Sequence, residues 1–235
     1  MTRLLSTAVA FPKGEVTQTA MAEAISRWLT GREADLPKIL RILQRSGVER
    51  RQLVVPLEEL FRQDEFGTRN RVYIEHAVEL AAEVARAALR EAAVASESID
   101  LVTTASCTGF MIPSLDAHLA NVLPFRRGIR RLPITELGCA GGAMALTYTA
   151  DILRGQPDAV ALVVAVEISS VNAQPDDMNM ANLVSCALFG DGAAAVLLAG
   201  EESELARSHP RAPRLVRYVE DSVTPENTLL VATMS

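Results

Sequence analysis

The stretch Gly138-Cys139-Ala140-Gly141-Gly142 decides how this chain is interpreted. An apolar run over 132–135 precedes it, and a helix-forming run from 143 onward follows it. The pattern predicts a cysteine on a tight strand-to-helix turn, where glycines let a substrate or other backbone come close. A thiol at a helix N-terminus meets the positive end of the helix dipole, which favours the nucleophilic thiolate. Cys139 is therefore the strongest candidate nucleophile, and a small core residue is the alternative.

Composition narrows the class of protein. The chain has 235 residues, of which 49% are hydrophobic and 22% charged, so it can bury a core in one large α/β domain or two small ones. Aromatic residues make up only 4%, so packing must rest on Ala, Val and Leu. A net charge of −6 argues against a dedicated nucleic-acid binder. The N-terminus lacks the pattern of a signal peptide and the longest apolar run, 159–166, is too short for a membrane span, so we expect a cytoplasmic protein.

Three cysteines, Cys107, Cys139 and Cys186, are scattered along the chain. They form no Cys/His cluster at metal-ligand spacing, so we expect no metal and reduced thiols. No P-loop or GxGxxG motif occurs, so nothing indicates ATP or NAD, and we expect no cofactor.

Strand and helix patterns alternate along the chain, which predicts an α/β fold. Thr17 is a candidate N-cap. After Gly200 the sequence becomes charged and contains prolines, so we expect one domain over 1–200 and a different segment over 201–235. Strands are expected over 4–11, 99–105, 129–135, 159–168 and 193–198, with short ones over 215–219 and 229–232. Helices are expected over 17–29, 36–46, 68–95, 113–123, 143–153 and 181–188.

The helix expected over 36–46 carries Lys38, Arg41 and Arg45, whose spacing of three and four places them on one face. This face is either an ordinary solvated surface or a site for an anionic ligand. Cys107 is expected at a strand end, facing a ligand crevice or buried. Phe189 is either a core aromatic or a pocket wall. A nucleophilic cysteine needs a base, usually histidine, and neither His76, His118 nor His209 has a supporting context.

Two motifs together carry a family resemblance. Gly138-Cys139-Ala140-Gly141-Gly142 and, further on, Leu188-Phe189-Gly190-Asp191-Gly192-Ala193-Ala194-Ala195 resemble the type III polyketide synthases, that is, the chalcone and stilbene synthase family. Ser106-Cys107-Thr108-Gly109-Phe110, with Pro113-Ser114, resembles its bacterial members, notably the tetrahydroxynaphthalene synthases. The resemblance runs from about residue 4 to 200. It implies a thiolase-like fold, of which this chain would be the N-terminal half, a mixed five-stranded sheet with helices on both faces.

The resemblance also implies functions for individual residues. Cys139 would accept an acyl group from coenzyme A, and decarboxylation of malonyl-CoA would supply the carbanion that extends it. Lys38, Arg41 and Arg45 match the cations that hold the coenzyme A phosphates. The family acts as a homodimer, and Ile112 matches a position that approaches the partner's cavity. Phe189 matches the gatekeeping phenylalanine, Cys107 a pocket cysteine, and Ser169 and Asn172 positions that shape the pocket.

The sequence also departs from the family pattern. The family's catalytic His and Asn lie in a C-terminal half, and no His-Pro-Gly-Gly stretch occurs here; His209-Pro210-Arg211 matches two residues of it. The resemblance thus implies a truncated, frame-shifted or split synthase, weak or inactive alone. Two alternatives stay open: a non-catalytic half that serves only as a dimerisation or interaction module, and a ketoacyl synthase III-like enzyme that uses carrier protein. The starter unit, the number of extensions and the cyclisation mode do not follow from the sequence.

Overall fold

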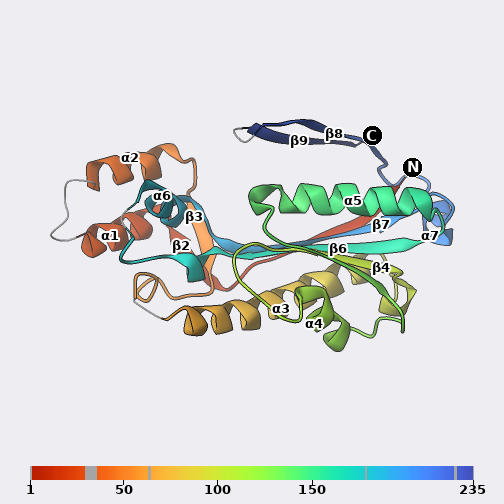
Figure 1. Cartoon of the computed structure of the whole chain (residues 1–235), viewed down its shortest axis with the longest axis horizontal. Coiled ribbons are helices and arrows are strands. Elements are labelled where there is room, and N and C mark those ends of the chain that lie inside the picture. The colour runs from red at the N-terminus through yellow and green to blue at the C-terminus, as the bar shows by residue number, and fades with distance from the viewer. Residues whose placement is uncertain (1, 30–35, 63–64, 178, 225–226, 235) are drawn as a thin grey trace.

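A five-stranded mixed sheet forms the centre of the larger part of the molecule, in the order β1-β7-β6-β4-β5 (Figure 1). β4 pairs in parallel with both β5 and β6, whereas β7 is antiparallel to both β6 and β1. The computed structural model describes residues 2–29, 36–62, 65–177, 179–224 and 227–234. The strands of this sheet are β1 (Arg3–Ala10), β4 (Leu101–Ala105), β5 (Arg130–Ile134), β6 (Val160–Ile168) and β7 (Asp191–Ala199).

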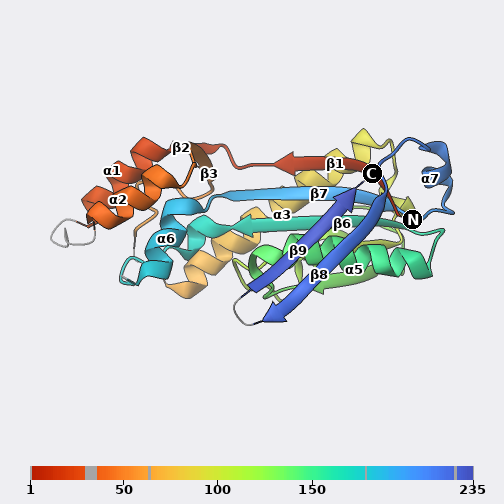
Figure 2. The same ribbon diagram turned by 90° about the horizontal axis from the view of Figure 1, so that it is seen from above.

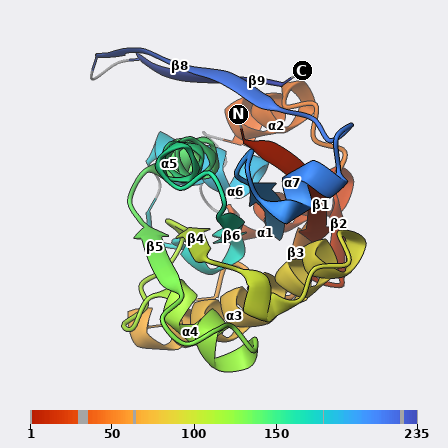
Figure 3. The same ribbon diagram turned by 90° about the vertical axis from the view of Figure 1, so that its right-hand side faces the viewer.

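Helices cover both faces of this sheet, as expected (Figure 3). α3 (Phe66–Glu91) and α4 (Leu115–Val122) lie on one face, and α5 (Gly141–Gly155) lies on the other. Small side chains bring α3 close to the strands: Ala77, Ala81, Ala85 and Ala88 are fully buried. The predicted reliance on alanine and branched aliphatic residues therefore holds, because dense packing needs matched shapes rather than large side chains.

A cap of smaller elements closes one end of the sheet (Figure 1). It contains β2 (Gly14–Thr17), α1 (Gln18–Trp28), α2 (Leu36–Arg45), β3 (Arg50–Leu53) and α6 (Met180–Leu188). Thr17 caps α1 as predicted, because its side chain accepts a hydrogen bond of 3.2 Å from the Ala20 amide. The pairing of β2 with β3 was not predicted, because no strand was expected over 14–17 or 50–53. These four-residue strands show no sustained apolar alternation, so their pattern was too weak to indicate a strand.

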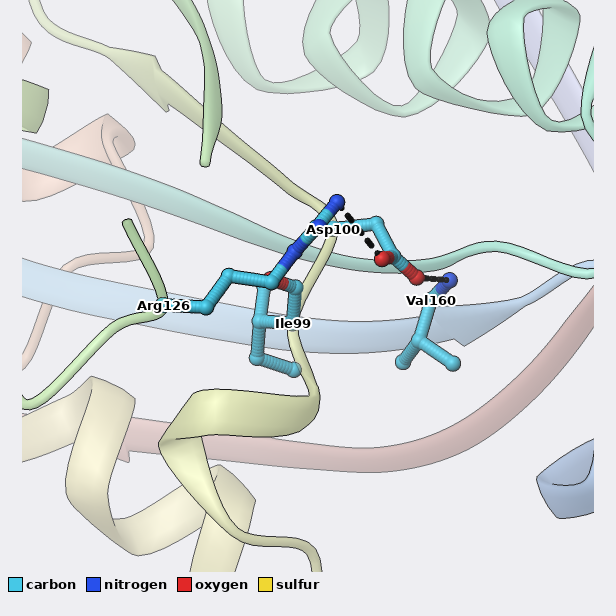
Figure 4. A network of polar contacts seen from close by, with 4 residues as sticks. All are labelled: Ile99, Asp100, Arg126 and Val160. Atoms are coloured by element: carbon cyan, nitrogen blue, oxygen red, sulfur yellow. Dashed lines mark hydrogen bonds and ion pairs between the residues drawn. The ribbon is translucent and has the colours of Figure 1, made fainter. Parts of the chain in front are cut away.

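At the other end of the sheet, Asp100 ties the starts of the three parallel strands together (Figure 4). Its carboxylate accepts a hydrogen bond from the Val160 amide (2.8 Å) and pairs with the Arg126 guanidinium (2.9 Å). The backbone of Asp100 also bonds to Val160 and to Arg130. One residue at the start of β4 thus connects the starts of β5 and β6.

The segment after Gly200 contains α7 (Glu204–Ser208) and an antiparallel hairpin of β8 (Leu215–Thr224) and β9 (Asn227–Met234). The hairpin crosses over α5 (Figure 2). Both predicted strands are present and longer than expected, whereas α7 was not predicted. Within the described part of the chain, no helix combines the length and apolar character needed to span a membrane.

Candidate functional site

Three predicted site residues follow the carboxyl ends of the three parallel strands. Cys107 lies two residues after β4. Cys139 follows β5 and lies in a 3₁₀ turn, η2 (Gly138–Ala140), directly before α5. Ser169 begins a second 3₁₀ turn, η3 (Ser169–Asn172), directly after β6. Because carboxyl ends of adjacent parallel strands share one edge of a sheet, these residues lie at the same end of it, the end at which the cap lies (Figure 1).

The Cys139 turn has the predicted strand-to-helix form. Its thiol is exposed, and η2 continues without a break into α5. Gly138 has a φ of +53°, a left-handed conformation that favours glycine. At Gly141 and Gly142 an added Cβ would make only ordinary contacts with Ala105 (3.7 Å) and Ala165 (3.9 Å), so space alone does not require glycine there. The left-handed conformation of Gly138 is therefore the feature of this turn that favours glycine.

Cys107 has a different environment, dominated by Glu167 near the end of β6. The Cys107 amide donates to both carboxylate oxygens of Glu167 at 3.1 Å, and the Thr108 hydroxyl donates to the same group at 2.7 Å. Burial and the Glu167 charge raise the pKa of the Cys107 thiol to about 11, with a smaller contribution from Cys139. Cys107 therefore stays protonated at neutral pH and suits a wall position better than a nucleophilic one.

A cavity of about 160 Å³ lies between the cap and the end of β6. Phe189, Ser169 and Asn172, three of the predicted pocket residues, line it together with Thr108. A neighbouring cavity of about 250 Å³ shares Thr108 and Asn172 with the first and adds Cys107. The two shared residues are bonded to each other, because the Asn172 side-chain amide donates to the Thr108 carbonyl at 2.7 Å. The structure thus brings four of the five predicted pocket residues together.

The fifth predicted pocket residue, Ile112, is elsewhere. Its side chain is 81% exposed and lines neither of these cavities. It precedes Pro113, through a cis peptide bond, on the loop that joins β4 to α4.

Asp191, the first residue of β7, holds the pocket wall from behind. Only 4% of it is exposed, and its carboxylate accepts hydrogen bonds from the amide and hydroxyl of Ser170 and from the Val54 amide. Burial raises the pKa of Asp191, and these hydrogen bonds oppose the shift. Asp191 therefore fixes η3 against the segment that follows β3, and with it the neighbouring Ser169.

Sequence reasoning missed the functions of Glu167 and Asp191. Asp191 was seen only as part of a motif. Glu167 lies inside the long apolar run of β6, where a single charge is a weak signal. Its place one residue before the strand end is the feature that could have indicated it.

The remaining predicted residues lie on the periphery. Lys38, Arg41 and Arg45 are exposed on α2 in the cap, opposite the buried Ile39 and Leu43, which confirms that the three cations share a solvent face.

The histidines lie outside this arrangement. His76 on α3 is 3.5 Å from Glu79, His209 contacts the Leu205 carbonyl at 2.9 Å, and His118 lies on α4. Within the described ranges, no hydrogen bond joins any of them to Cys139, and no group of His, Cys, Asp or Glu is arranged to hold a metal ion.

Comparison with known proteins places this geometry. The family model described as "Chalcone and stilbene synthases, N-terminal domain" matches residues 1–202. The chain belongs to the chalcone and stilbene synthase family. Within that family it is 36% identical over 225 residues to 1,3,6,8-tetrahydroxynaphthalene synthase of Streptomyces griseus, covering 95% of this chain and 60% of that protein. It is also 36% identical over 197 residues to phloroglucinol synthase of Pseudomonas fluorescens, covering 83% of this chain and 55% of that one.

Solved structures of the family agree with the fold. The crystal structure of 1,3,6,8-tetrahydroxynaphthalene synthase from Streptomyces coelicolor, a bacterial type III polyketide synthase, has a TM-score of 0.86 and 34% sequence identity. The match covers 94% of this chain and 61% of that one. This chain thus spans about 60% of the length of these relatives. The predicted thiolase-like fold and family are confirmed, while the functions of the individual site residues stay predictions.

Proposed function

We propose that this chain is an acyltransferase of the type III polyketide synthase kind, with Cys139 as the residue that accepts the acyl group. The observation that carries the proposal is the exposed Cys139 on the η2–α5 turn, at the sheet edge that also carries Cys107 and Ser169. The similarity to tetrahydroxynaphthalene and phloroglucinol synthases supports the same reaction class.

The chemistry needs two steps. In the first, the Cys139 thiolate attacks the carbonyl of an acyl-CoA thioester, the carbon–sulfur bond to coenzyme A breaks, and coenzyme A leaves as its thiolate, which takes a proton from water. In the second, malonyl-CoA loses carbon dioxide, and the carbanion that remains attacks the Cys139 thioester, which releases the thiolate. The backbone amides of the first turn of α5, which have no partner within the helix, are the proposed donors to the oxyanion that forms on the attacked carbonyl.

Coenzyme A thioesters are the proposed substrates, and no separate cofactor is proposed. Lys38, Arg41 and Arg45 are the proposed phosphate-binding cations, because they share the exposed face of α2 in the cap that covers the site end of the sheet. Their combined replacement by alanine should raise the KM for an acyl-CoA by about tenfold or more, since each exposed cation contributes about 0.5 kcal/mol or more to phosphate binding. The loading rate from the same acyl group on N-acetylcysteamine, which lacks those phosphates, should not change.

A second copy of the chain is the proposed partner, with exposed Ile112 near the neighbouring pocket. Light scattering over a concentration series tests this. A particle that stays monomeric at all concentrations would contradict it.

A second candidate function is a non-catalytic interaction module. It is favoured by the exposure of Val9 and Phe11 at the edge of the sheet, 65% and 56%, because such apolar side chains suit a protein contact. Under this alternative the chain would associate but Cys139 would not be acylated. The ketoacyl synthase alternative would instead load Cys139 from acyl carrier protein and not from coenzyme A.

The deciding experiment incubates the chain with hexanoyl-CoA and measures its intact mass. We expect slow formation of one acyl adduct in the wild type and in the matched control Cys186→Ala, and none in Cys139→Ala. Slow loading is expected because His76 and His209 contact other groups and, in the described part of the chain, no histidine is hydrogen-bonded to Cys139. No adduct in any of the three proteins would contradict the proposed function.

A further inference from the structure

Two residues of α3, Asn70 and Tyr73, contact the loop that follows β4, residues 106–110. The Asn70 side-chain amide donates to the Phe110 carbonyl at 2.8 Å, and its oxygen accepts from the Phe110 amide at 2.8 Å. This two-point pairing satisfies both backbone groups of Phe110, as a neighbouring strand would. Because Phe110 is 59% exposed, its side chain does little to hold the loop.

Tyr73, one turn further along α3, holds the same loop at two more points. Its hydroxyl is 2.7 Å from the Ser106 hydroxyl. An added Cβ on Gly109 would come within 2.1 Å of the Tyr73 ring, so the ring lies directly against the glycine backbone. Only 2% of Tyr73 is exposed, and residues three apart on a helix share a face. Asn70 and Tyr73 thus form one continuous support.

The loop is also bonded to the end of β6. Cys107 and Thr108 donate to Glu167, and Thr108 also accepts a hydrogen bond from the Ile168 amide. Tyr73 and Cys107 together line a cavity of about 100 Å³ that extends toward Glu136, close to the Cys139 turn. The position of this loop therefore sets the space between Cys107 and the segment that carries the proposed nucleophile.

We propose that Asn70 and Tyr73 are positioning residues that set which acyl chains Cys139 accepts, by holding residues 106–110 in place. The part of this inference that concerns acyl chains rests on the proposed function, whereas the part that concerns the position of the loop rests on the contacts alone. A loop held at Ser106, Gly109 and Phe110 cannot move outward to admit a longer chain without breaking these contacts. Asn70 also lines the cavity of about 250 Å³ and Tyr73 the cavity of about 100 Å³, so a readout on the loop itself is needed to separate release of the loop from a change in cavity shape.

Two variants separate the parts of the support. Asn70→Ala removes both hydrogen bonds to Phe110 but keeps the Tyr73 ring, whereas Tyr73→Phe keeps the ring on Gly109 and removes only the bond to Ser106. Glu83→Ala, at an exposed position further along α3, is the matched control. Each protein is loaded with acetyl-, hexanoyl- and decanoyl-CoA, and the rate of adduct formation on Cys139 is compared within each protein.

A second readout does not depend on acyl transfer. Burial is the main cause that raises the pKa of both Cys107 and Cys186 to about 11. Cys186 lies on α6 and not on the loop, although it lines one cavity with Thr108. Their alkylation by iodoacetamide at one fixed pH is measured in each variant. General destabilisation would raise both rates together, whereas release of the loop would raise only that of Cys107.

We expect Asn70→Ala to raise the ratio of Cys107 to Cys186 alkylation about threefold or more and to shift loading toward decanoyl-CoA by a similar factor. Tyr73→Phe should do the same more weakly, and adding Ser106→Ala to it should change nothing further. Normal loading with unchanged ratios in both variants would overturn the inference. If the wild type is not loaded at all but the variants still raise the ratio of Cys107 to Cys186 alkylation, the proposed function is contradicted. The claim that Asn70 and Tyr73 hold residues 106–110 in place would then still stand.

Discussion

The polar contacts at the starts of the three parallel strands, β4, β5 and β6, differ from those at their carboxyl ends. At their starts, the Asp100 carboxylate is shared between Val160 and Arg126, so the polar groups there bond to one another (Figure 4). At their carboxyl ends, backbone groups are equally well bonded by Glu167 and Asp191, but the Cys139 side chain points outward. At the Asp100 end the polar groups bond to one another. At the carboxyl end the two carboxylates hold backbone segments whose side chains line a cavity.

This difference separates residues that stabilise the fold from residues that also shape a site. A change at the Asp100 end should reduce stability and leave the thiols as they were. A change at the carboxyl end should alter the environment of Cys107 or the pocket as well. The following changes test that division.

The largest loss of stability is expected from Asp191→Ala. It leaves the amides of Ser170 and Val54 without their acceptor in a buried place, which should lower the free energy of unfolding by about 3 kcal/mol. Urea denaturation measures this, with exposed Asp158→Ala as the control. Because η3 loses its anchor, alkylation of Cys186 at the pocket should also rise. A loss below about 1 kcal/mol in the free energy of unfolding would show that Asp191 does not hold η3 against the segment that follows β3.

Asp100→Ala should cost about 2 kcal/mol, because it removes one hydrogen bond and a half-exposed ion pair. The same denaturation series measures it. Unlike the changes at the carboxyl ends of the strands, Asp100→Ala should leave the alkylation rates of Cys107 and Cys139 at their wild-type values. A change in their ratio would mean that the two ends are coupled and would break the comparison.

Glu167→Gln tests the electrostatics of the site end. The Glu167 charge raises the pKa of Cys107, so its removal should lower that pKa and leave more thiolate at any fixed pH. Alkylation of Cys107 at pH 9 should increase about threefold to tenfold, since a pKa lower by one gives tenfold more thiolate. The rate for Cys186 is the internal control. An unchanged alkylation rate for Cys107 would show that the charge of Glu167 does not raise the pKa of this thiol and that burial alone does.

The smallest effect is expected in the middle of the sheet, between the two ends. Thr103 on β4 and Thr149 on α5 share a buried hydrogen bond of 2.7 Å between hydroxyls. Thr149→Val should lower the free energy of unfolding by about 1 kcal/mol, because it leaves the Thr103 hydroxyl unpaired. Replacing both by valine should restore part of the loss, and a larger loss in the double variant would contradict this interpretation.

Sequence patterns predicted the main sheet and its helices because their signals are local: a continuous run for the wholly buried β4 and a periodic alanine face for α3. They could not predict the pairing of β2 with β3, which depends on contacts between segments more than thirty residues apart. At the site, the glycine-rich turn indicated Cys139 from local chemistry alone. Glu167 and Asn70 escaped notice because their importance lies in backbone groups that only the folded loop brings to them.

The central claim is that Cys139, and not Cys107, takes the acyl group. The most direct test digests the chain after incubation with hexanoyl-CoA and locates the hydroxylamine-sensitive acyl group by peptide mass spectrometry. Because the pKa of Cys107 is about 11, the account predicts acyl label on the peptide containing Cys139 and none above background on the one containing Cys107. Equal labelling of both peptides, or label on Cys107 alone, would contradict it.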